Sequence, residues 1–568
     1  MNAPSNVAYQ VMWNRLISVV EEQAQALVRT AFSTSVREAG DLSAGVYNAD
    51  GLMLAQAVTG TPGHVNAMAD AVAHFIRRIG RENIFEGDVY ITNDPWEGTG
   101  HLHDFTVVTP SFFNGKMVGF FACTAHVVDV GGRGFGADGA SVYEEGIHVP
   151  IMKFAERGTV DKTLVAMLRS NVREPDQLIG DIFALSSCNE IGHRRLAEMM
   201  QEFALTDLAG IAAFILDNSR RATLERIAAL PRTSADGEMT VDGFDKPITL
   251  KVKLTIHADR IVSDFEGTSG IDKKGINCPL VYAKAYACYA LKCAIAPEIP
   301  NNAASLAPFE IAAPEDSIVN AKHPAPVALR HIVGHFVPDT VYNALDKILP
   351  DMVPAEGAGC LCNFQVSLRP RTDQTPPADA VRSEVLAFNS GGAGARPQYD
   401  GLNATALPSG VITMPVEATE HAGPVIIWRK ELRPDSGGAG QQRGGLGQFM
   451  EVGAREGHEF DFQAMFDRVN HPALGRRGGG SGGATTIAQD DDSKMNGKGK
   501  QFVPHGRRVM LGLPGGAGYG DAAKRPKSSV MRDLARGYIT AQTAKQDYAL
   551  SDADIATVEA AIKSGQDL

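Results

Sequence analysis

Apolar residues recur at helical spacing over three parts of the chain, and each of these patterns predicts α-helix. The first part, residues 7–33, predicts one long amphipathic helix with charged residues between the apolar positions. A second helical pattern covers residues 65–79, and a third, richer in charge, runs from about residue 162 to residue 230. Short apolar runs of strand type separate these helical segments, so the first 230 residues predict an α/β region.

The pattern changes in the rest of the chain. Apolar and polar residues alternate from 239 to 265, as they do in strands, and residues 282–296 predict a buried helix. The region from about 355 to 526 is rich in glycine and has short apolar runs, which is typical of β structure with tight turns. Within it, the glycine run and aspartates of residues 476–500 predict a mobile loop beside a hairpin.

These patterns predict a mixed α+β fold with several domains. A chain of 568 residues is too long for one ordinary core. The middle and C-terminal portions are expected to be rich in β structure. The predicted segments are an N-terminal α/β region with the candidate site (1–230), a mixed α/β middle region (231–355), a glycine-rich β region (356–526) and a C-terminal helical segment (527–568).

Two clusters of histidine and aspartate flank one predicted hairpin. Strand patterns over residues 105–113 and 117–123 lie on either side of Asn114-Gly115, which is a strong turn signal. One cluster lies in residues 93–104 and the other in residues 126–132. Because a hairpin brings its outer ends together, the two clusters should meet. Imidazole with carboxylate is the ligand mixture expected for zinc, manganese or iron.

The sequence leaves the register of this hairpin open. A two-residue turn places His103 opposite His126, and strand alternation then gives a set of three histidines with His101. A three-residue turn shifts the register by one and places Asp104 opposite His126 instead. Both registers bring the two clusters together.

Three further carboxylates and one histidine are candidates for the same site. Asp41 lies between the first helix and the first predicted strand, where a turn carboxylate is also common. Asp129 follows the second cluster and could orient a ligand imidazole. Glu145 precedes a glycine on a predicted loop, and His64, before the second helix, is a weaker candidate for a pocket wall.

Composition narrows the classes of function. A formal net charge of −12 without a long Lys/Arg run argues against nucleic-acid binding. The seven cysteines have no framework spacing and favour a reducing compartment. The chain shows no signal-peptide pattern and no run of about 18 apolar residues. We therefore expect a cytoplasmic protein that has neither membrane nor nucleic acid as a partner.

The order of motifs along the chain resembles the hydantoinase B / 5-oxoprolinase family, the B-type subunit of ATP-dependent cyclic amide hydrolases such as N-methylhydantoinase and caprolactamase. An ordered series of matches is more specific than any single motif. The matching segments are Asp41 and residues 62–68, 93–95, 101–104, 126–132, 145–150, 171–176, 391–395, 431–440, 443–447 and 515–521.

The resemblance implies a divalent metal, zinc with manganese or iron as alternatives, that supplies hydroxide for hydrolysis. The ligands that it implies are Asp41, His101, Asp104 and His126. This set favours the register that pairs Asp104 with His126. At position 103 the chain departs from the family pattern, so His103 leaves a three-histidine variant open. Asp129 or Glu145 is the expected catalytic acceptor of the proton.

The resemblance also implies an activity, a cofactor and a partner. The activity is ATP-dependent ring opening of a lactam, a hydantoin or 5-oxoproline. ATP and Mg²⁺ would bind to an A-type partner subunit with an actin-like kinase fold, and the two chains would form an (αβ)₂ heterotetramer. This agrees with the absence of a G-x-x-x-x-G-K-[ST] motif here. Two alternatives are a subunit of a ketone carboxylase of the acetone or acetophenone type, and a non-catalytic scaffold with a structural metal.

Overall fold

The computed structural model describes residues 5–58, 61–371, 373 and 382–565, and the chain divides into two compact units. Unit 1 comprises Met1–Glu238, Leu250–Ala344 and Pro408–Val411. Unit 2 comprises Met239–Thr249, Leu345–Leu407 and Ile412–Leu568. Both units contain helices and strands, so the predicted mixed α+β, multi-domain fold is confirmed.

The centre of unit 1 is a seven-stranded antiparallel sheet with the order β2-β1-β5-β4-β3-β6-β7. Its buried residues belong to one large hydrophobic cluster with those of the helices that cover it. Its strands are β1 (Leu42–Asn48), β2 (Met53–Gln56), β3 (Val89–Thr92), β4 (Asp104–Phe113), β5 (Lys116–His126), β6 (Met152–Glu156) and β7 (Thr159–Val160).

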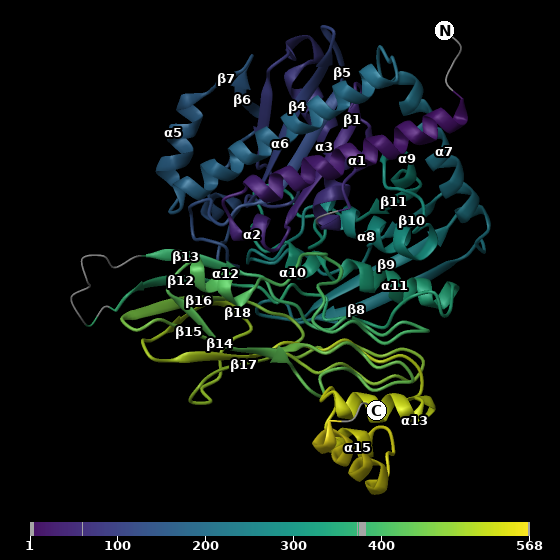
Figure 1. Ribbon diagram of the computed structural model, residues 1–568, viewed down its shortest axis with the longest axis vertical. Coiled ribbons are helices and arrows are strands. Elements are labelled where there is room, and N and C mark those ends of the chain that lie inside the picture. Colours follow the sequence, from purple (N-terminus) through teal and green to yellow (C-terminus); the bar gives the residue numbers. More distant parts are fainter. Residues whose placement is uncertain (1–4, 59–60, 372, 374–381, 566–568) are drawn as a thin grey trace. The chain divides into compact units, whose positions relative to one another are not determined.

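Helices cover both faces of this sheet. Tyr47 on β1 pairs with Phe120 on β5, so strand alternation places Tyr47 and Phe121 on opposite faces. The Tyr47 hydroxyl donates to the Met68 carbonyl of α3 (Pro62–Ile79) at 3.0 Å, whereas Phe121 contacts Gly192 of α6 (Pro175–Glu202). Helix α3 therefore covers one face, and α6 covers the other together with α1 (Asn6–Thr30), which lies beside it (Figure 1).

The β4–β5 hairpin combines features of both predicted registers. Phe113 pairs with Lys116, so the turn has the two residues Asn114 and Gly115, both with positive φ. An irregularity between Ser111 and Phe112 then shifts the pairing by one residue. Because of this bulge, Asp104 lies opposite His126, and the register that pairs His103 with His126 is wrong.

Apart from α7 and α8, the remaining helices of unit 1 have ten residues or fewer. The first predicted helix ends three residues early, because the backbone N–H groups of Phe32 and Ser33 donate to Asp181 Oδ1 at 2.7 and 3.1 Å. The helices of unit 1 other than α1, α3 and α6 are α2 (Thr34–Arg37), α4 (Val142–Glu145), α5 (Lys162–Asn171), α7 (Ala209–Ala228), α8 (Leu280–Ile295), α9 (Ala303–Leu306) and α10 (His331–Gly334).

Unit 1 also contains a smaller group of strands. Strand β10 (Ile261–Asp264) pairs antiparallel with β9 (Ile248–Ile256) and parallel with β11 (Phe309–Ala312). Helix α8 packs against both β11 and α3, and so connects these strands to the face of the main sheet that α3 covers. The chain passes from one unit to the other within β8 (Ser234–Val241), β9 and α11 (Val337–Ile348).

Unit 2 contains two four-stranded antiparallel sheets, with the orders β13-β12-β16-β18 and β14-β15-β19-β17. Buried side chains of both sheets form one hydrophobic cluster. Its elements are β12 (Phe364–Pro370), β13 (Ser383–Ala387), α12 (Val416–His421), β14 (Val425–Leu432), β15 (Gln448–Ala454), β16 (His458–Met465), β17 (Thr486–Gln489), β18 (Lys498–Val503), β19 (Arg508–Gly512), α13 (Lys527–Ala535), α14 (Ala541–Gln546) and α15 (Asp552–Ser564).

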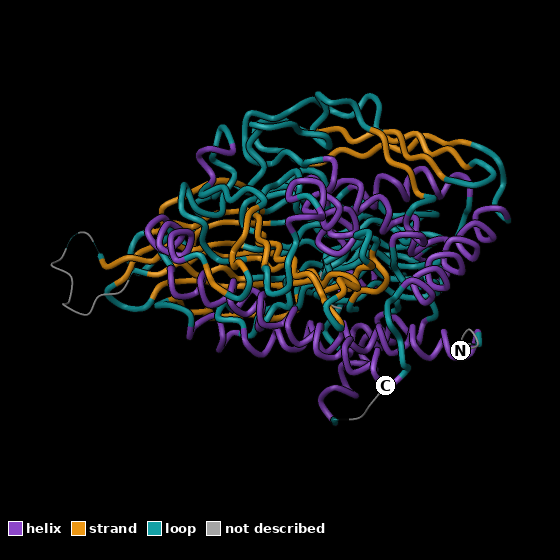
Figure 2. The backbone as a smooth tube through the Cα atoms, turned by 90° about the horizontal axis from the view of Figure 1, so that it is seen from above, coloured by secondary structure: helices purple, strands orange, loops and turns teal. Residues whose placement is uncertain are grey.

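Extended glycine-rich segments of unit 2 lie side by side outside any assigned strand, and they run together in green to yellow in Figure 1. Gly516 N–H donates to the Gly445 carbonyl, and the Gly516 carbonyl accepts from Gly438 N–H, both at 2.9 Å. Figure 2 shows how much of the backbone lies outside helices and strands. We call this set of segments, within residues 391–402, 436–447, 473–483 and 514–519, the glycine bundle.

The glycines that predicted a mobile loop belong to this bundle instead. Gly480 N–H donates to the Ala439 carbonyl at 2.6 Å, and Gly482 N–H donates to the Ala473 carbonyl at 2.9 Å. A Cβ on Gly479 would lie 2.1 Å from the Gly518 carbonyl oxygen. The prediction of a mobile loop is therefore wrong for this part of residues 476–500. These glycines are present because backbone packs directly on backbone.

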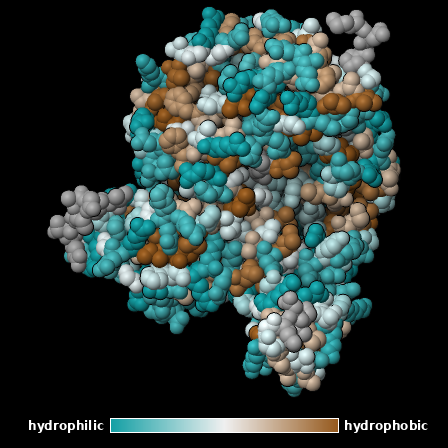
Figure 3. All heavy atoms as spheres, viewed as in Figure 1, coloured by the Kyte–Doolittle hydropathy of each residue, from teal (hydrophilic) through white to brown (hydrophobic). Residues whose placement is uncertain are grey.

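The face of the molecule drawn in Figure 3 is mostly polar. On the face drawn in Figure 3, hydrophilic residues dominate and hydrophobic ones occur in small scattered groups, as is usual for folded domains in water. Among the described helices, none is long and apolar enough to cross a bilayer.

Candidate metal centre

Three adjacent strands of the main sheet of unit 1 bring the candidate ligands together. Asp104 begins β4 directly opposite His126 at the end of β5. On the other side of β5, the His126 N–H donates to the carbonyl of Asp41, just before β1, at 3.2 Å. His126 is six residues from Phe120, so both lie on the face that α3 covers. The candidate site therefore forms between these ends of β4 and β5 and the first turn of α3.

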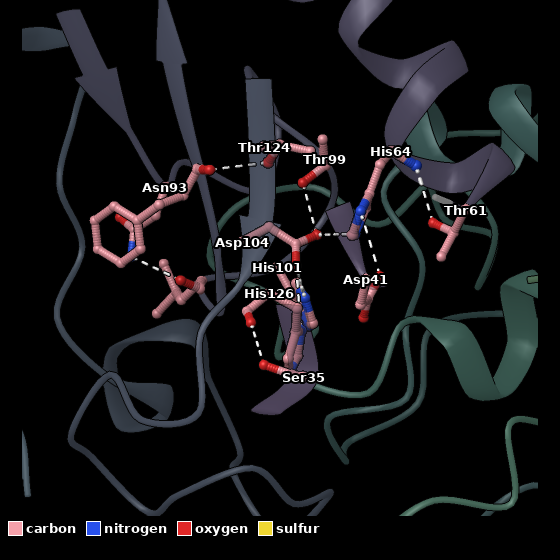
Figure 4. Close-up of polar contacts among 12 residues, drawn as sticks. Ser35, Asp41, Thr61, His64, Asn93, Thr99, His101, Asp104, Thr124 and His126 are labelled. Atoms are coloured by element: carbon pink, nitrogen blue, oxygen red, sulfur yellow. Dashed lines mark hydrogen bonds and ion pairs between the residues drawn. The ribbon is translucent and has the colours of Figure 1, made fainter. Parts of the chain in front are cut away.

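His101, Asp104 and His126 form a buried triad (Figure 4). Each offers one ligand atom, and these atoms lie within 4.8 Å of one another. Asp104 Oδ1 is 2.8 Å from His101 Nε2 and 3.2 Å from His126 Nδ1. In a tetrahedral zinc site, bonds of about 2.0–2.2 Å place ligand atoms about 3.4 Å apart. The two distances from Asp104 Oδ1 are close to this value.

The hydrogen bonding of His101 supports a cation at this point. Its Nδ1 is 2.8 Å from the Ala328 carbonyl oxygen, which only accepts, so Nδ1 carries the hydrogen. Burial and the nearby Arg330 guanidinium lower the pKa of His101 to about 3, so the ring is neutral. The lone pair of Nε2 then points at the anionic Asp104 Oδ1. The lone pairs of His101 Nε2 and Asp104 Oδ1 converge in a buried site, which suits a divalent cation between them. The contact of His101 Nδ1 with a backbone carbonyl is also typical of a metal-bound histidine.

The loop that carries His101 is fixed by the Asn93-Asp94-Pro95 motif. The Asn93 side-chain amide donates to the carbonyls of Leu102 and Ile147 at 2.8 and 2.9 Å, and its oxygen accepts from Val149 N–H at 2.6 Å. Asp94 Oδ1 accepts from the backbone N–H groups of the two turn residues 96 and 97, at 2.7 and 3.0 Å. The motif therefore shapes the approach to the triad without providing a ligand.

Asp41 lies at the edge of the triad, next to His64. His64 Nδ1 is 3.5 Å from Asp41 Oδ1, and His64 Nε2 is 2.9 Å from Asp104 Oδ2 (Figure 4). Burial would lower the pKa of His64, but the carboxylates of Asp104 and Asp41 raise it above its ordinary value. His64 therefore lies between the two acids, in contact with both. The Asp41 carboxylate is not one of the three clustered ligands, and its role as a fourth ligand remains a prediction.

Arg330, which the sequence did not single out, completes the surroundings of Asp104. Its Nη2 donates to Asp104 Oδ2 and its Nε donates to the Thr99 carbonyl at 2.6 Å. Burial alone would raise the pKa of Asp104, but the Arg330 guanidinium holds it well below its usual range. Asp104 is therefore ionised, as a metal ligand must be.

His103 lies beside the triad rather than in it. Its ring stacks on that of His126, with centroids 5.5 Å apart, and lies 4.7 Å from the ring of Phe135. Among the described residues, neither of its ring nitrogens has a hydrogen-bond partner. Burial lowers the pKa of His103 well below its ordinary value, so the ring is neutral. The geometry thus favours Asp104 over His103 as the ligand opposite His126.

Asp129 is held in place by its own loop. Its Oδ1 accepts from Gly131 N–H at 3.0 Å and from the Arg173 guanidinium. Its Oδ2 accepts from the backbone N–H groups of Arg173 and Glu174. With both oxygens engaged, Asp129 shapes the turn after His126, and its catalytic role remains a prediction.

Glu145 is connected to the triad through the backbone of one residue, Ala328. Its Oε1 accepts from the backbone N–H groups of Val327 and Ala328 at 2.7 and 2.9 Å, and the Ala328 carbonyl is the partner of His101. Its Oε2 is buried and has no partner among the described residues. Burial raises the pKa of Glu145 to about 8, which suits a group that exchanges a proton near neutral pH.

The raised pKa of Glu145 predicts a pH-dependent stability. A glutamate in the unfolded chain titrates near pH ~4.3, so between there and about pH 8 the folded state keeps a proton that the unfolded state loses. Stability should therefore fall as the pH rises through this window. Glu145→Gln, which mimics the protonated acid, should match the unaltered chain at low pH and exceed its stability by a few kcal/mol at pH ~8.

Urea unfolding at several pH values measures this difference. Glu202→Gln, at the exposed end of α6, is the matched control and should leave the pH dependence unchanged. If Glu145→Gln and the unaltered chain lose stability equally between pH ~5 and pH ~8, Glu145 is not protonated in the folded protein.

Fold and site together define a class: multi-domain α+β proteins with a buried, two-histidine, one-carboxylate cluster at the ends of inner strands of an antiparallel sheet. The model of the Hydantoinase B/oxoprolinase family matches residues 5–522 of the chain. The chain belongs to this family, as its motifs predicted. The B-type subunit of a putative D-/L-hydantoinase from a Pseudomonas species is 27% identical over 586 residues, covering 96% of this chain and 95% of that protein.

Two solved structures share the fold. The ATP-dependent caprolactamase from Pseudomonas jessenii has a TM-score of 0.85 and 22% identity, with coverage of 99% of this chain and 100% of that chain. The nucleotide-free structure of an acetone carboxylase has a TM-score of 0.84 and 18% identity, with coverage of 98% of this chain and 83% of that chain. At these identities the likeness is one of fold.

Proposed function

We propose that this chain is the metal-dependent subunit of an ATP-dependent cyclic amide hydrolase, which opens a lactam, hydantoin or 5-oxoproline ring. The observation that carries the proposal is the buried triad of His101, Asp104 and His126 in a member of this family. Both the nitrogen and the carboxylate donors suit zinc, with manganese or iron as alternatives. A divalent ion bound there would lower the pKa of a water molecule towards about 7 and so would supply hydroxide at neutral pH.

The residues around the triad would orient the ligands and accept the proton. The Ala328 carbonyl fixes the His101 ring, and Asp41 is proposed as a further ligand beside His64. Glu145 is the better supported of the two candidate proton acceptors, and with a pKa of about 8 it would accept the proton in its ionised form, which predominates only above that pH. Its Oε2 has no partner among the described residues, whereas both oxygens of Asp129 are engaged.

ATP is proposed to bind to a second subunit, of the A type with an actin-like kinase fold, in an (αβ)₂ assembly. Two observations support a partner: the chain has no G-x-x-x-x-G-K-[ST] motif, and the hydantoinase relative that it matches along most of both chains is named as one subunit of its enzyme. We also propose a cytoplasmic location, since all seven cysteines are free thiols, as is usual in a reducing compartment.

Co-expression with the ATP-binding partner tests the function. The complex is expected to open at least one ring among lactams, hydantoins and 5-oxoproline with ATP consumption, and to lose this activity after chelation of the metal. The isolated chain should show no ATP turnover. A complex that hydrolyses none of these rings, or a metal-free complex with full activity, would contradict the proposal.

A subunit of an ATP-dependent ketone carboxylase is the second candidate, and the fold shared with the acetone carboxylase favours it. The same panel with ketones, with and without bicarbonate, separates the two. ATP turnover that needs both a ketone and bicarbonate indicates the carboxylase. A third outcome, metal binding without any turnover in the complex, indicates a scaffold with a structural metal.

A further inference from the structure

One oxygen of Asp104 is surrounded by hydrogen-bond donors. Asp104 Oδ2 accepts from the Thr99 hydroxyl at 2.7 Å and from the Arg330 guanidinium, and it lies 2.9 Å from His64 Nε2. All of these side chains are buried. A carboxylate oxygen offers about two lone-pair positions, so three donors saturate it.

The other oxygen has different neighbours. Asp104 Oδ1 faces ring nitrogens of the two other residues of the triad, His101 Nε2 at 2.8 Å and His126 Nδ1 at 3.2 Å. Only Oδ1 is therefore free to bind a cation. Asp104 is prepared to act as a ligand through a single oxygen.

Arg330 is held independently of Asp104. Its Nε donates to the Thr99 carbonyl at 2.6 Å, and its guanidinium lies over the ring of Tyr282, 4.0 Å from the centroid. The chain makes room for it at Gly100, where φ is +106° and a Cβ would lie 2.4 Å from Arg330 Cδ. A rigid, planar donor in a prepared slot is suited to fixing a carboxylate.

We propose that Arg330, Thr99 and His64 are positioning residues that restrict Asp104 to one-oxygen coordination and so favour a small four-coordinate ion, such as zinc, over six-coordinate manganese. The inference rests on the proposed metal site. Release of Oδ2 would let the carboxylate turn or bind through both oxygens. This would loosen the site for zinc and suit an ion with more ligands.

Arg330→Met tests this, because methionine fills part of the slot but cannot donate. In the full-length chain, affinity for Zn²⁺ measured by chelator competition is expected to fall about 10–100-fold, and affinity for Mn²⁺ to fall less. The visible absorption of the Co²⁺-loaded protein, which is strongest in four-coordinate sites, should weaken. Arg330→Lys should recover part of the loss, since it keeps the charge but not the planar fork.

Two further variants keep the test decisive. Thr99→Val removes one donor with little change of shape, and it gives the same comparison, with a smaller loss, where Arg330→Met does not fold. Arg195→Met removes an arginine of unit 1 that pairs on the surface with Glu22 and should leave both readouts unchanged. Folded Arg330→Met and Thr99→Val with the zinc affinity and the Co²⁺ spectrum of the unaltered chain would overturn the inference. An unaltered chain that binds none of these ions would instead reject the proposed metal site and, with it, this role of Arg330.

Discussion

His101→Ala is expected to release the metal and to lower the activity of the complex by about 10³-fold or more. His101 supplies one of three clustered ligand atoms, and its ring is fixed by the Ala328 carbonyl at 2.8 Å. An alanine leaves Asp104 and His126 of the triad, and these two, even with Asp41 as a further ligand, fall short of the set that holds a zinc-like ion tightly at neutral pH. Without the ion, hydroxide at neutral pH is lost as the nucleophile.

Metal content of the purified chain, determined by elemental analysis, and ATP-dependent ring opening by the complex measure the two effects separately. His257→Ala is the matched control, since His257 is a partly exposed histidine of unit 1 between β9 and β10. It should keep both metal and activity. If His101→Ala retains stoichiometric metal and full turnover, the triad is not the metal site.

The sequence predicted the meeting of the two histidine clusters but not how they meet. Asn114-Gly115 signalled a two-residue turn, and that turn is present. The bulge between Ser111 and Phe112 has no comparable signal, yet it changes which side chain faces His126. A shift of one residue moves every side chain to the other face, so local turn chemistry alone could not decide the ligand set.

The surroundings of Asp104 come from distant parts of the chain. His64 lies on α3 and Arg330 lies just before α10, and neither position is fixed by residues near the hairpin. Arg330 could have been noticed in the sequence, because its neighbours from Ala328 to Val333 are apolar apart from His331. A buried arginine needs a partner, but the sequence does not tell which of the many acids it is.

The sequence pattern was least accurate about the structural role of the glycines between residues 355 and 526. The richness in glycine between residues 355 and 526 predicted β structure with tight turns, and two sheets are present. Many of the glycines, however, lie in extended segments that pack backbone on backbone in the glycine bundle. Propensity rules assign glycine to turns and loops because they describe single segments, whereas the bundle depends on several segments from one unit.

Gly516→Ala is therefore expected to destabilise unit 2 by more than about 3 kcal/mol, although it adds only a methyl group. A Cβ at this position would lie 2.0 Å from the Ala393 carbonyl oxygen. That oxygen cannot easily move, because it accepts from Gly445 N–H at 2.9 Å, and Gly516 itself is hydrogen-bonded on both sides. Hydrogen exchange of peptides from the bundle, with peptides of unit 1 as an internal reference, measures the effect.

Gly480→Ala is the matched control for this prediction. Gly480 lies in the same bundle, but the nearest atom to its added Cβ would be Ala439 N at 3.3 Å, so a shift of a few tenths of an ångström is enough. Its destabilisation should be much smaller, below about 1–2 kcal/mol. Similar protection of the bundle in both variants would show that these segments are not packed backbone on backbone. The glycines would then be explained by turns, as the sequence pattern first indicated.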